Sequence, residues 1–366
     1  MLWPADRSLA VLTQAGVGVT VPHLRDLADR WVAAGAVPRA PAWQEAHALA
    51  GHMINDWPGD GGGPVHQDAD SPAAGMLAAL TRLGDTDSIV AFLSRVTAAG
   101  AALFRRDNPA IVMALRLFPP GAAADLLERV ITGNAPKRFA ACADLLSKVS
   151  AALPSVRPAD LSEAAATLVA ALPANATPRD WTWRGETVDA GFVSDLLIAL
   201  GAIDQGLADR AVTHILAHPK CYDPDSILVP AARDRLRGTG VAGQPVVTRL
   251  RAACLAHLST RIALPLAPPA DWRRPNAVGC GCKHCTGLSR FLADPAQRVW
   301  VFRAVAADRN HVEGAIMTAN CDVNMETDQH GRPYSLICTK NQASYERRVK
   351  QREQDLADAE SLQALN

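Results

Sequence analysis

The chain has 366 residues, of which 49% are hydrophobic and 20% are charged, and this composition excludes a disordered chain. Its length predicts either two domains or an elongated helical array. Lys plus Arg and Asp plus Glu each total 37, so the net charge of zero gives no general attraction for nucleic acid or another polyanion.

Helices are expected along most of the chain, because Ala and Leu recur and aromatic residues make up only 5%. Ile89, Phe92, Leu93 and Val96 follow the i, i+3, i+4, i+7 spacing of an amphipathic helix. Gly84 and Asp85 come directly before them, as a stop for the preceding helix and an N-cap for this one. The fold class is therefore predicted to be mainly α.

The next helices continue this pattern. Asn108 and Pro109 predict a capped first turn, and the stripe from Leu126 to Ile131 predicts a further helix that Gly133 ends. The segments 92–96 and 126–130 each begin with two apolar residues and end with Arg followed by Val, and they fall 34 residues apart. This spacing favours an irregular α-solenoid or HEAT-like helical array, with a non-repetitive helical bundle as the alternative.

Proline and glycine clusters mark the connections. Residues 57–72 and 173–186 are expected to be loops, and the proline-rich stretch 265–279 is expected to be a linker. The predicted organisation is a helical domain over residues 1–264, the linker, and a small cysteine-rich module over residues 280–366.

Three cysteines crowd into six positions, Cys280, Cys282 and Cys285. The C-x-C-x2-C spacing lets a short turn bring three thiolates to one ion, so we expect a structural zinc site. Zinc takes four ligands, and spacing alone does not choose the fourth. The candidates are His284, His311, Cys321, His330 and Cys338.

We favour His311, because Asp294–Pro295 predicts the start of a rigid helix with His311 near its C-terminal end. Val299, Phe302, Val305 and Val312 would mark the apolar side of that helix. The alternating segments 321–327 and 334–340 predict a β-hairpin that turns near His330, and a charged helix is expected over residues 344–365. The module is therefore expected to be α+β.

The C-terminal quarter also resembles a known region. Its pattern is CGCKHC from Cys280, LSRFLADP from Leu288, RNH ending at His311, and GRPYSLICTK from Gly331. It resembles the cysteine-rich region behind 2-oxoglutarate/iron(II)-dependent oxygenase domains in some fungal and bacterial proteins. The resemblance implies Cys280, Cys282, Cys285 and His311 as metal ligands. It does not extend to the oxygenase domain itself.

Other candidate sites have simpler interpretations. His66 and Asp68 form an H-x-D pair in a glycine-rich loop, and His214 and His218 are expected to be ordinary histidines of a helix. Cys142, Cys221 and Cys254 are expected to be buried thiols. Five basic side chains near the C-terminus share their helix with as many acidic ones, which favours a solvated face: Lys340, Arg347, Arg348, Lys350 and Arg352.

No phosphate-binding loop, dinucleotide fingerprint or nucleophile elbow occurs, which favours a non-catalytic protein over an enzyme. The leading prediction is a protein-interaction scaffold with structural Zn²⁺ and an unknown protein partner. One alternative is an accessory or C-terminal part of an oxygenase system, and another is nucleic-acid binding through the zinc module. Reduced thiols and the absence of a secretion signal or apolar span favour the cytoplasm and no membrane partner.

Overall fold

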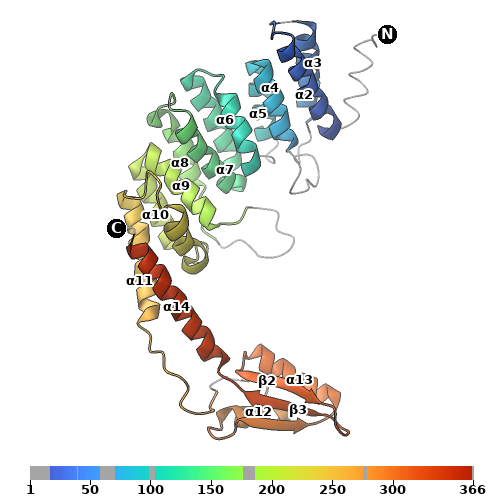
Figure 1. Cartoon of the computed structure of the whole chain (residues 1–366), viewed down its shortest axis with the longest axis vertical. Helices are drawn as coiled ribbons and strands as arrows, with labels where there is room; N and C mark the ends of the chain where they lie inside the picture. Colours follow the sequence, from blue (N-terminus) through green and yellow to red (C-terminus); the bar gives the residue numbers. More distant parts are fainter. Residues whose placement is uncertain are drawn as a thin grey trace. The chain divides into compact units, whose positions relative to one another are not determined.

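A computed structural model of the chain describes residues 17–38, 40–57, 71–98, 104–175, 186–274 and 278–364 (Figure 1). The described part is mainly helical, with one small three-stranded antiparallel sheet. The chain divides into two compact units, the first comprising Met1–Ala256 with Leu362–Asn366 and the second His257–Ser361. The division at Ala256 falls inside helix α11 (Pro245–Ile262), and the division at Ser361 falls inside the last turn of α14 (Ala343–Gln363).

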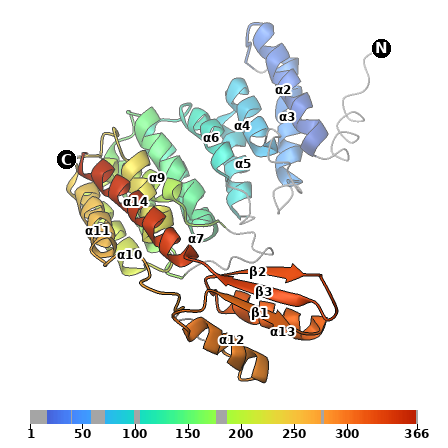
Figure 2. The same cartoon turned by 60° about the horizontal axis from the view of Figure 1, so that its bottom comes forward.

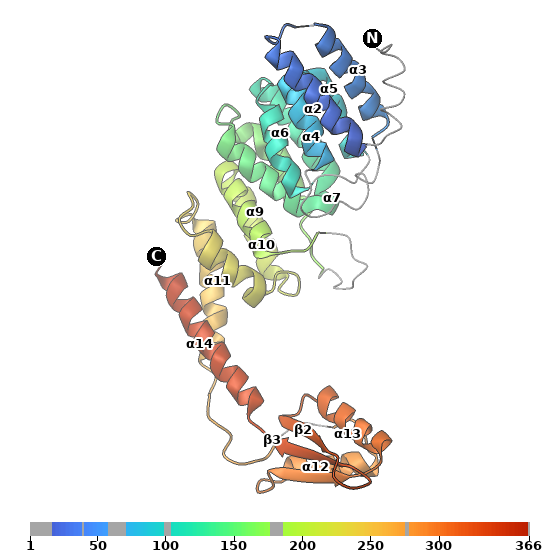
Figure 3. The ribbon, with the colours of Figure 1, turned by 45° about the vertical axis from the view of Figure 1, so that its right-hand side comes forward.

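The first unit is built from helices that follow one another closely along the chain (Figure 3). Its principal contacts join helices one or two places apart in sequence order. The α-helices are α2 (Val17–Ala33), α3 (Pro41–Asn55), α4 (Pro72–Leu83), α5 (Thr86–Ala98), α6 (Asn108–Leu115), α7 (Pro120–Ala152), α8 (Ser162–Ala170), α9 (Ala190–Ile203) and α10 (Gln205–Ala217). Short turns of other helix types are η1 (Arg105–Asp107), η2 (Pro158–Leu161), η3 (Pro224–Leu228) and η4 (Ala231–Arg235).

The sequence signals between α4 and α5 act as expected. Gly84 ends α4 in the left-handed conformation with φ of 63°, and the Asp85 carboxylate accepts a hydrogen bond from the Ser88 amide at 3.1 Å. Helix α6 begins at Asn108 itself, so Asn108 is the first helical residue and not the predicted N-cap. The Asn108 amide is buried and donates instead to the Ala141 carbonyl and the Asp144 carboxylate, which ties α6 to α7.

Gly133 does not end a helix, contrary to the prediction. Helix α7 continues to Ala152, and Gly133 lies inside it, where a Cβ would stand 2.0 Å from Thr97 Cγ2 of α5. The glycine therefore permits a close approach of two helices. The interruption in α7 comes later, at Arg138, and the Glu186 carboxylate accepts hydrogen bonds from the Ala140 and Ala141 amides that follow it.

The second unit contains the sheet, whose strands lie in the order β1-β3-β2 (Figure 2). The strands are β1 (Val299–Arg303), β2 (Val323–Asp328) and β3 (Ser335–Lys340). Helix α12 (Lys283–Ala293) precedes β1, and helix α13 (Ala306–Thr318) connects β1 to β2. β2 and β3 form the predicted hairpin, with Glu326 opposite Ile337. The sheet is wider than predicted, because β1 pairs with β3 and places Val301 opposite Ile337.

Strand β1 corrects the prediction of a helix running from Asp294 to His311. Its side chains alternate in exposure along the strand, with Trp300 and Phe302 half-buried against the core. A helix would need every third or fourth residue on one side, whereas this segment has four successive apolar residues that fit either pattern. The helix that carries His311 starts only at Ala306, so His311 lies in its middle rather than near its end.

Helices α12 and α13 share one hydrophobic core with the sheet. The core joins Leu288, Phe291 and Leu292 of α12, Val312 and Ile316 of α13, and Val323, Leu336 and Cys338 of the strands. Because both helices pack into this core, the start of α12 and the middle of α13 are held at fixed positions relative to each other.

Candidate metal centre

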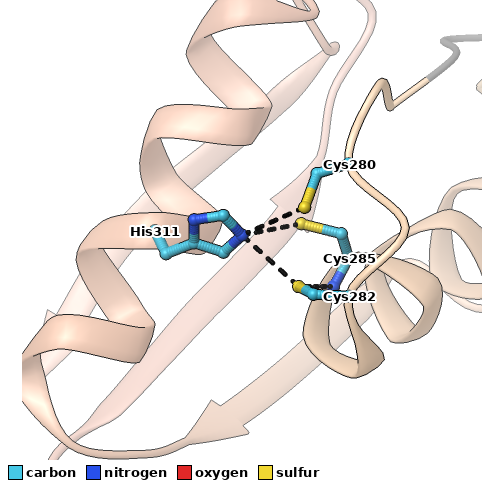
Figure 4. A group of neighbouring side chains, drawn as sticks. All are labelled: Cys280, Cys282, Cys285 and His311. Atoms are coloured by element: carbon cyan, nitrogen blue, oxygen red, sulfur yellow. Dashed lines mark hydrogen bonds between the residues drawn. The ribbon is translucent and has the colours of Figure 1, made fainter.

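The three clustered cysteines lie at the N-terminal end of α12. Cys282 is the N-cap residue of this helix, and its sulfur accepts a hydrogen bond from the Cys285 amide at 3.4 Å. Cys285 belongs to the first turn and is fully buried, while Cys280 precedes the helix. The C-x-C-x2-C spacing thus folds as an extended entry followed by one helical turn, which directs three sulfurs toward one point (Figure 4).

His311 completes this group from α13. Its Nε2 atom lies 3.5 Å from Cys280 Sγ, 3.4 Å from Cys282 Sγ and 3.3 Å from Cys285 Sγ. All four potential ligand atoms lie within 4.8 Å of one another. Within the ranges that the structure describes, this is the one group of three or more His, Cys, Asp or Glu side chains arranged to hold a metal ion.

The surroundings shift the pKa values of Cys282 and Cys285 in opposite directions. The backbone amide of Cys285 and the neighbouring thiols lower the pKa of Cys282 to about 6, so this sulfur is readily a thiolate. Burial, followed by the two neighbouring cysteines, raises the pKa of Cys285 to about 12. Three thiolates packed this closely repel one another, and a divalent cation among them would remove that cost.

The other four candidates for a fourth ligand lie elsewhere. His284 faces Asp308, with 3.6 Å between Nε2 and Oδ2, and packs edge-on against Phe302. His330 is exposed in the hairpin turn and bonds to Asp328. Cys321 packs at the margin of the hydrophobic core, and Cys338 is buried within it. The structure therefore brings His311, of the five candidates, to the cysteine cluster.

Arg309 is a supporting residue that the sequence reading missed. It is buried, its Nη1 donates to the Ala304 carbonyl at 2.7 Å, and its guanidinium lies 5.4 Å from the centre of the Tyr334 ring. These contacts fix the first turn of α13 to β1 and to the hairpin, two residues before His311.

One side of the cluster is open to solvent. Cys280 and His311 line a hollow of about 560 Å³ together with small residues of α13, among them Gly314 and Ala315. His311 itself is exposed. A chelator or an exchanging metal ion can therefore reach the group without unfolding the module.

The remaining sequence candidates do not form comparable groups. The rings of His214 and His218 lie with their centres 4.2 Å apart and their planes tilted by 33°, and both form hydrogen bonds with backbone carbonyls, as expected of ordinary histidines. His66 and Asp68 lie outside the described residues. The thiols predicted to be buried, Cys142, Cys221 and Cys254, are buried.

The arrangement can hold a metal ion with three sulfurs and one imidazole nitrogen, a donor set consistent with zinc. No described helix combines the length and apolar character that crossing a membrane requires. Comparisons with family models, with curated proteins and with solved structures find no match to the chain.

Proposed function

We propose that the chain is a non-catalytic protein-interaction scaffold whose C-terminal module is stabilised by one zinc ion. The observation that supports it most directly is the convergence within 4.8 Å of three sulfurs at the start of α12 and one imidazole of α13. Three thiolates and one imidazole fill the tetrahedral coordination of zinc, whereas catalytic zinc usually keeps a position for water. Such a site contributes folding free energy to a module with a small core.

The proposed ligands are Cys280, Cys282, Cys285 and His311. Thiolate and imidazole donors suit zinc, while the non-haem iron of oxygenases takes two histidines and one carboxylate. We therefore place the oxygenase-related alternative second. It predicts that the iron-loaded chain decarboxylates 2-oxoglutarate, alone or with a second subunit, and such turnover would overturn the non-catalytic role.

The scaffold part of the proposal is supported by the helix order of the first unit. Contacts between helices one or two places apart are typical of solenoid arrays, which offer extended surfaces to protein partners. Met113 of α6 is 49% exposed, and Leu117, which follows the end of that helix, is 40% exposed. The proposal assigns these two apolar side chains to the contact with a protein partner.

The metal part is tested by elemental analysis of the purified full chain, prepared without added metal. We expect one zinc ion per chain, lost in Cys282→Ser and in His311→Ala, with loss of module structure on chelation. Cys321→Ser is the matched control, because it removes a thiol of the same module that lies outside the cluster. Iron in place of zinc, or equal metal content in all variants, would contradict the proposed site.

The scaffold part is tested by affinity purification of the full chain from its native cells. We expect a defined partner protein that is lost with Met113→Glu plus Leu117→Glu and retained with Thr213→Glu, an exposed control on α10. Zinc content must stay constant in all three proteins. Retention of the same partner by the double variant would remove this surface as the contact.

A further inference from the structure

A pocket in the second unit lies between the C-terminal end of α11, the segment that follows it, and α14. Its volume is about 180 Å³. Since a water molecule occupies about 30 Å³ of liquid, this is the volume of roughly six waters. Binding sites for drug-sized ligands start at about 300 Å³, so the pocket suits a much smaller molecule or a single side chain.

Positive charge dominates the wall that α14 provides. Arg348, Gln351, Arg352 and Asp355 line the pocket with the i, i+3, i+4, i+7 spacing of one helix face. The glutamates of the helix fall on its opposite side by the same geometry: Glu346, Glu353 and Glu360. The pocket face of α14 therefore carries Arg348, Arg352 and Asp355, while the three glutamates lie on the other side of the helix together with Lys350.

The single carboxylate of the pocket is already paired. Arg261 donates to both Asp355 oxygens, at 2.6 and 2.5 Å, and Gln351 donates to Oδ1 at 2.9 Å. Asp355 is buried, so this pair is fixed in place and its charges cancel locally. Among the described residues, Arg348 and Arg352 form no ion pair with a carboxylate.

These two arginines differ in how firmly they are held. Arg352 Nη1 donates to the Leu264 carbonyl at 3.1 Å, which orients its guanidinium at the pocket edge. Arg348 is exposed and forms no ion pair among the residues that the structure describes. A guanidinium offers a planar fork of donors that matches a carboxylate in two parallel hydrogen bonds.

The segment that follows α11 supplies an apolar part of the lining. Leu264, Pro265 and Leu266 form this part, and Leu264 is 60% exposed although it is a large aliphatic residue. A ligand that places aliphatic carbon against these residues removes apolar surface from water. An inorganic anion would meet the arginines but would leave these residues uncovered.

We propose that this pocket binds a carboxylate carried on a short aliphatic body, with Arg348 and Arg352 holding the carboxylate and Leu264, Pro265 and Leu266 contacting the aliphatic part. The pocket volume admits a branched acid of about six carbons. Either a free aliphatic acid or the C-terminal residue of a peptide provides this chemistry. The pocket lies apart from the metal cluster in sequence and is independent of the scaffold role.

The test is calorimetric titration of the full chain with 4-methylpentanoate and with N-acetyl-leucine. Their uncharged amides, 4-methylpentanamide and N-acetyl-leucinamide, serve as ligand controls. We expect at least one acid to bind and both amides to bind at least about tenfold more weakly, because the amides lack the charge that the arginines recognise. Binding of 4-methylpentanoate alone identifies a free acid, and binding of N-acetyl-leucine alone identifies a peptide C-terminus.

The variants Arg348→Gln and Arg352→Gln should each weaken binding of the acid by at least about tenfold. Lys350→Gln removes a positive charge from the same helix outside the pocket lining and should bind as the unchanged protein does. Equal zinc content and helix content confirm that each variant is folded, and Arg348→Gln carries little risk because this side chain is exposed. Absence of binding by both acids, equal binding of the amides, or unchanged affinity in Arg348→Gln would overturn the proposal.

Discussion

The close contact between Gly133 of α7 and Thr97 of α5 gives a quantitative stability prediction. A Cβ at position 133 would lie 2.0 Å from Thr97 Cγ2, far inside van der Waals contact. Threonine relieves this overlap poorly, because two heavy groups on its Cβ restrict χ1. Overpacking of this kind costs about 1–3 kcal/mol, while replacing an interior helix glycine by alanine gains about 1 kcal/mol. We therefore expect Gly133→Ala to lower the free energy of unfolding by up to about 2 kcal/mol.

The assay is equilibrium urea unfolding of the full chain, followed by circular dichroism at a helix-sensitive wavelength. Gly121→Ala is the matched control in the same helix, since nothing lies within 4 Å of a Cβ there, and it should be neutral or slightly stabilising. Thr97→Ser removes Cγ2 and leaves the next Thr97 atoms at 3.5 and 3.6 Å, so it should restore most of the stability lost in Gly133→Ala. Equal stability of Gly133→Ala and Gly121→Ala would refute the reasoning.

Three further predictions concern single groups. Asp189→Ala removes the N-cap of α9, whose carboxylate accepts from the Phe192 amide at 2.6 Å, and should lower the melting temperature through a loss of about 1 kcal/mol. An unchanged melting curve would contradict the cap. Leu336→Ala, at a fully buried position of β3, should cost the second unit about 2–5 kcal/mol, read as a lower urea midpoint of the Trp300 indole signal in an NMR titration. A midpoint equal to that of the unchanged chain would exclude Leu336 from the core. The Ala296 and Gln297 amides hold the pKa of Asp294 below its usual 3.8. Its stabilising contribution should therefore be present above pH 3.8 and lost as pH falls through the lowered pKa, and a carboxyl NMR titration midpoint at or above 3.8 would contradict this.

The mainly helical fold could be predicted because its signals are local. The apolar spacing from Ile89 to Val96, with Gly84 and Asp85 before it, depends on residues within one or two helical turns. The hairpin of β2 and β3 was predictable for the same reason, since its two alternating segments follow each other directly. Such features need no knowledge of distant parts of the chain.

The errors arose where distant contacts decide the structure. Strand β1 pairs with β3, more than thirty residues later, and its four successive apolar residues give no period of their own. Gly133 reads as a terminator in isolation, and only the position of Thr97 shows why a side chain is absent there. The pocket at α14 was likewise not predicted, because the segment around Leu264 that completes its lining lies far earlier in the chain.

The metal cluster combines a local sequence signal with a contact between distant parts of the chain. The spacing of Cys280, Cys282 and Cys285 predicts a shared ion, because one short turn brings the three sulfurs together. The fourth member of the group is set by the packing of α13 against the sheet, and sequence spacing alone leaves five candidates. The prediction of His311 rested on a helix that starts at Asp294, whereas the helix starts at Ala306. The structure brings the predicted residue to the cysteines, but from the middle of its helix and not from the C-terminal end.

The contacts of His311 with the cysteines span 26 to 31 residues of chain. An ion bound there would act as a cross-link, closing a loop that contains α12 and β1. Closing a loop of this size reduces the conformational entropy of the unfolded chain. By the loop-entropy relation for disulfides, this raises the free energy of the unfolded state by about 3–4 kcal/mol. The β2–β3 hairpin lies outside this loop and assembles from neighbouring residues. Metal loading should therefore speed the docking of β1 onto β3 while leaving formation of the hairpin almost unchanged.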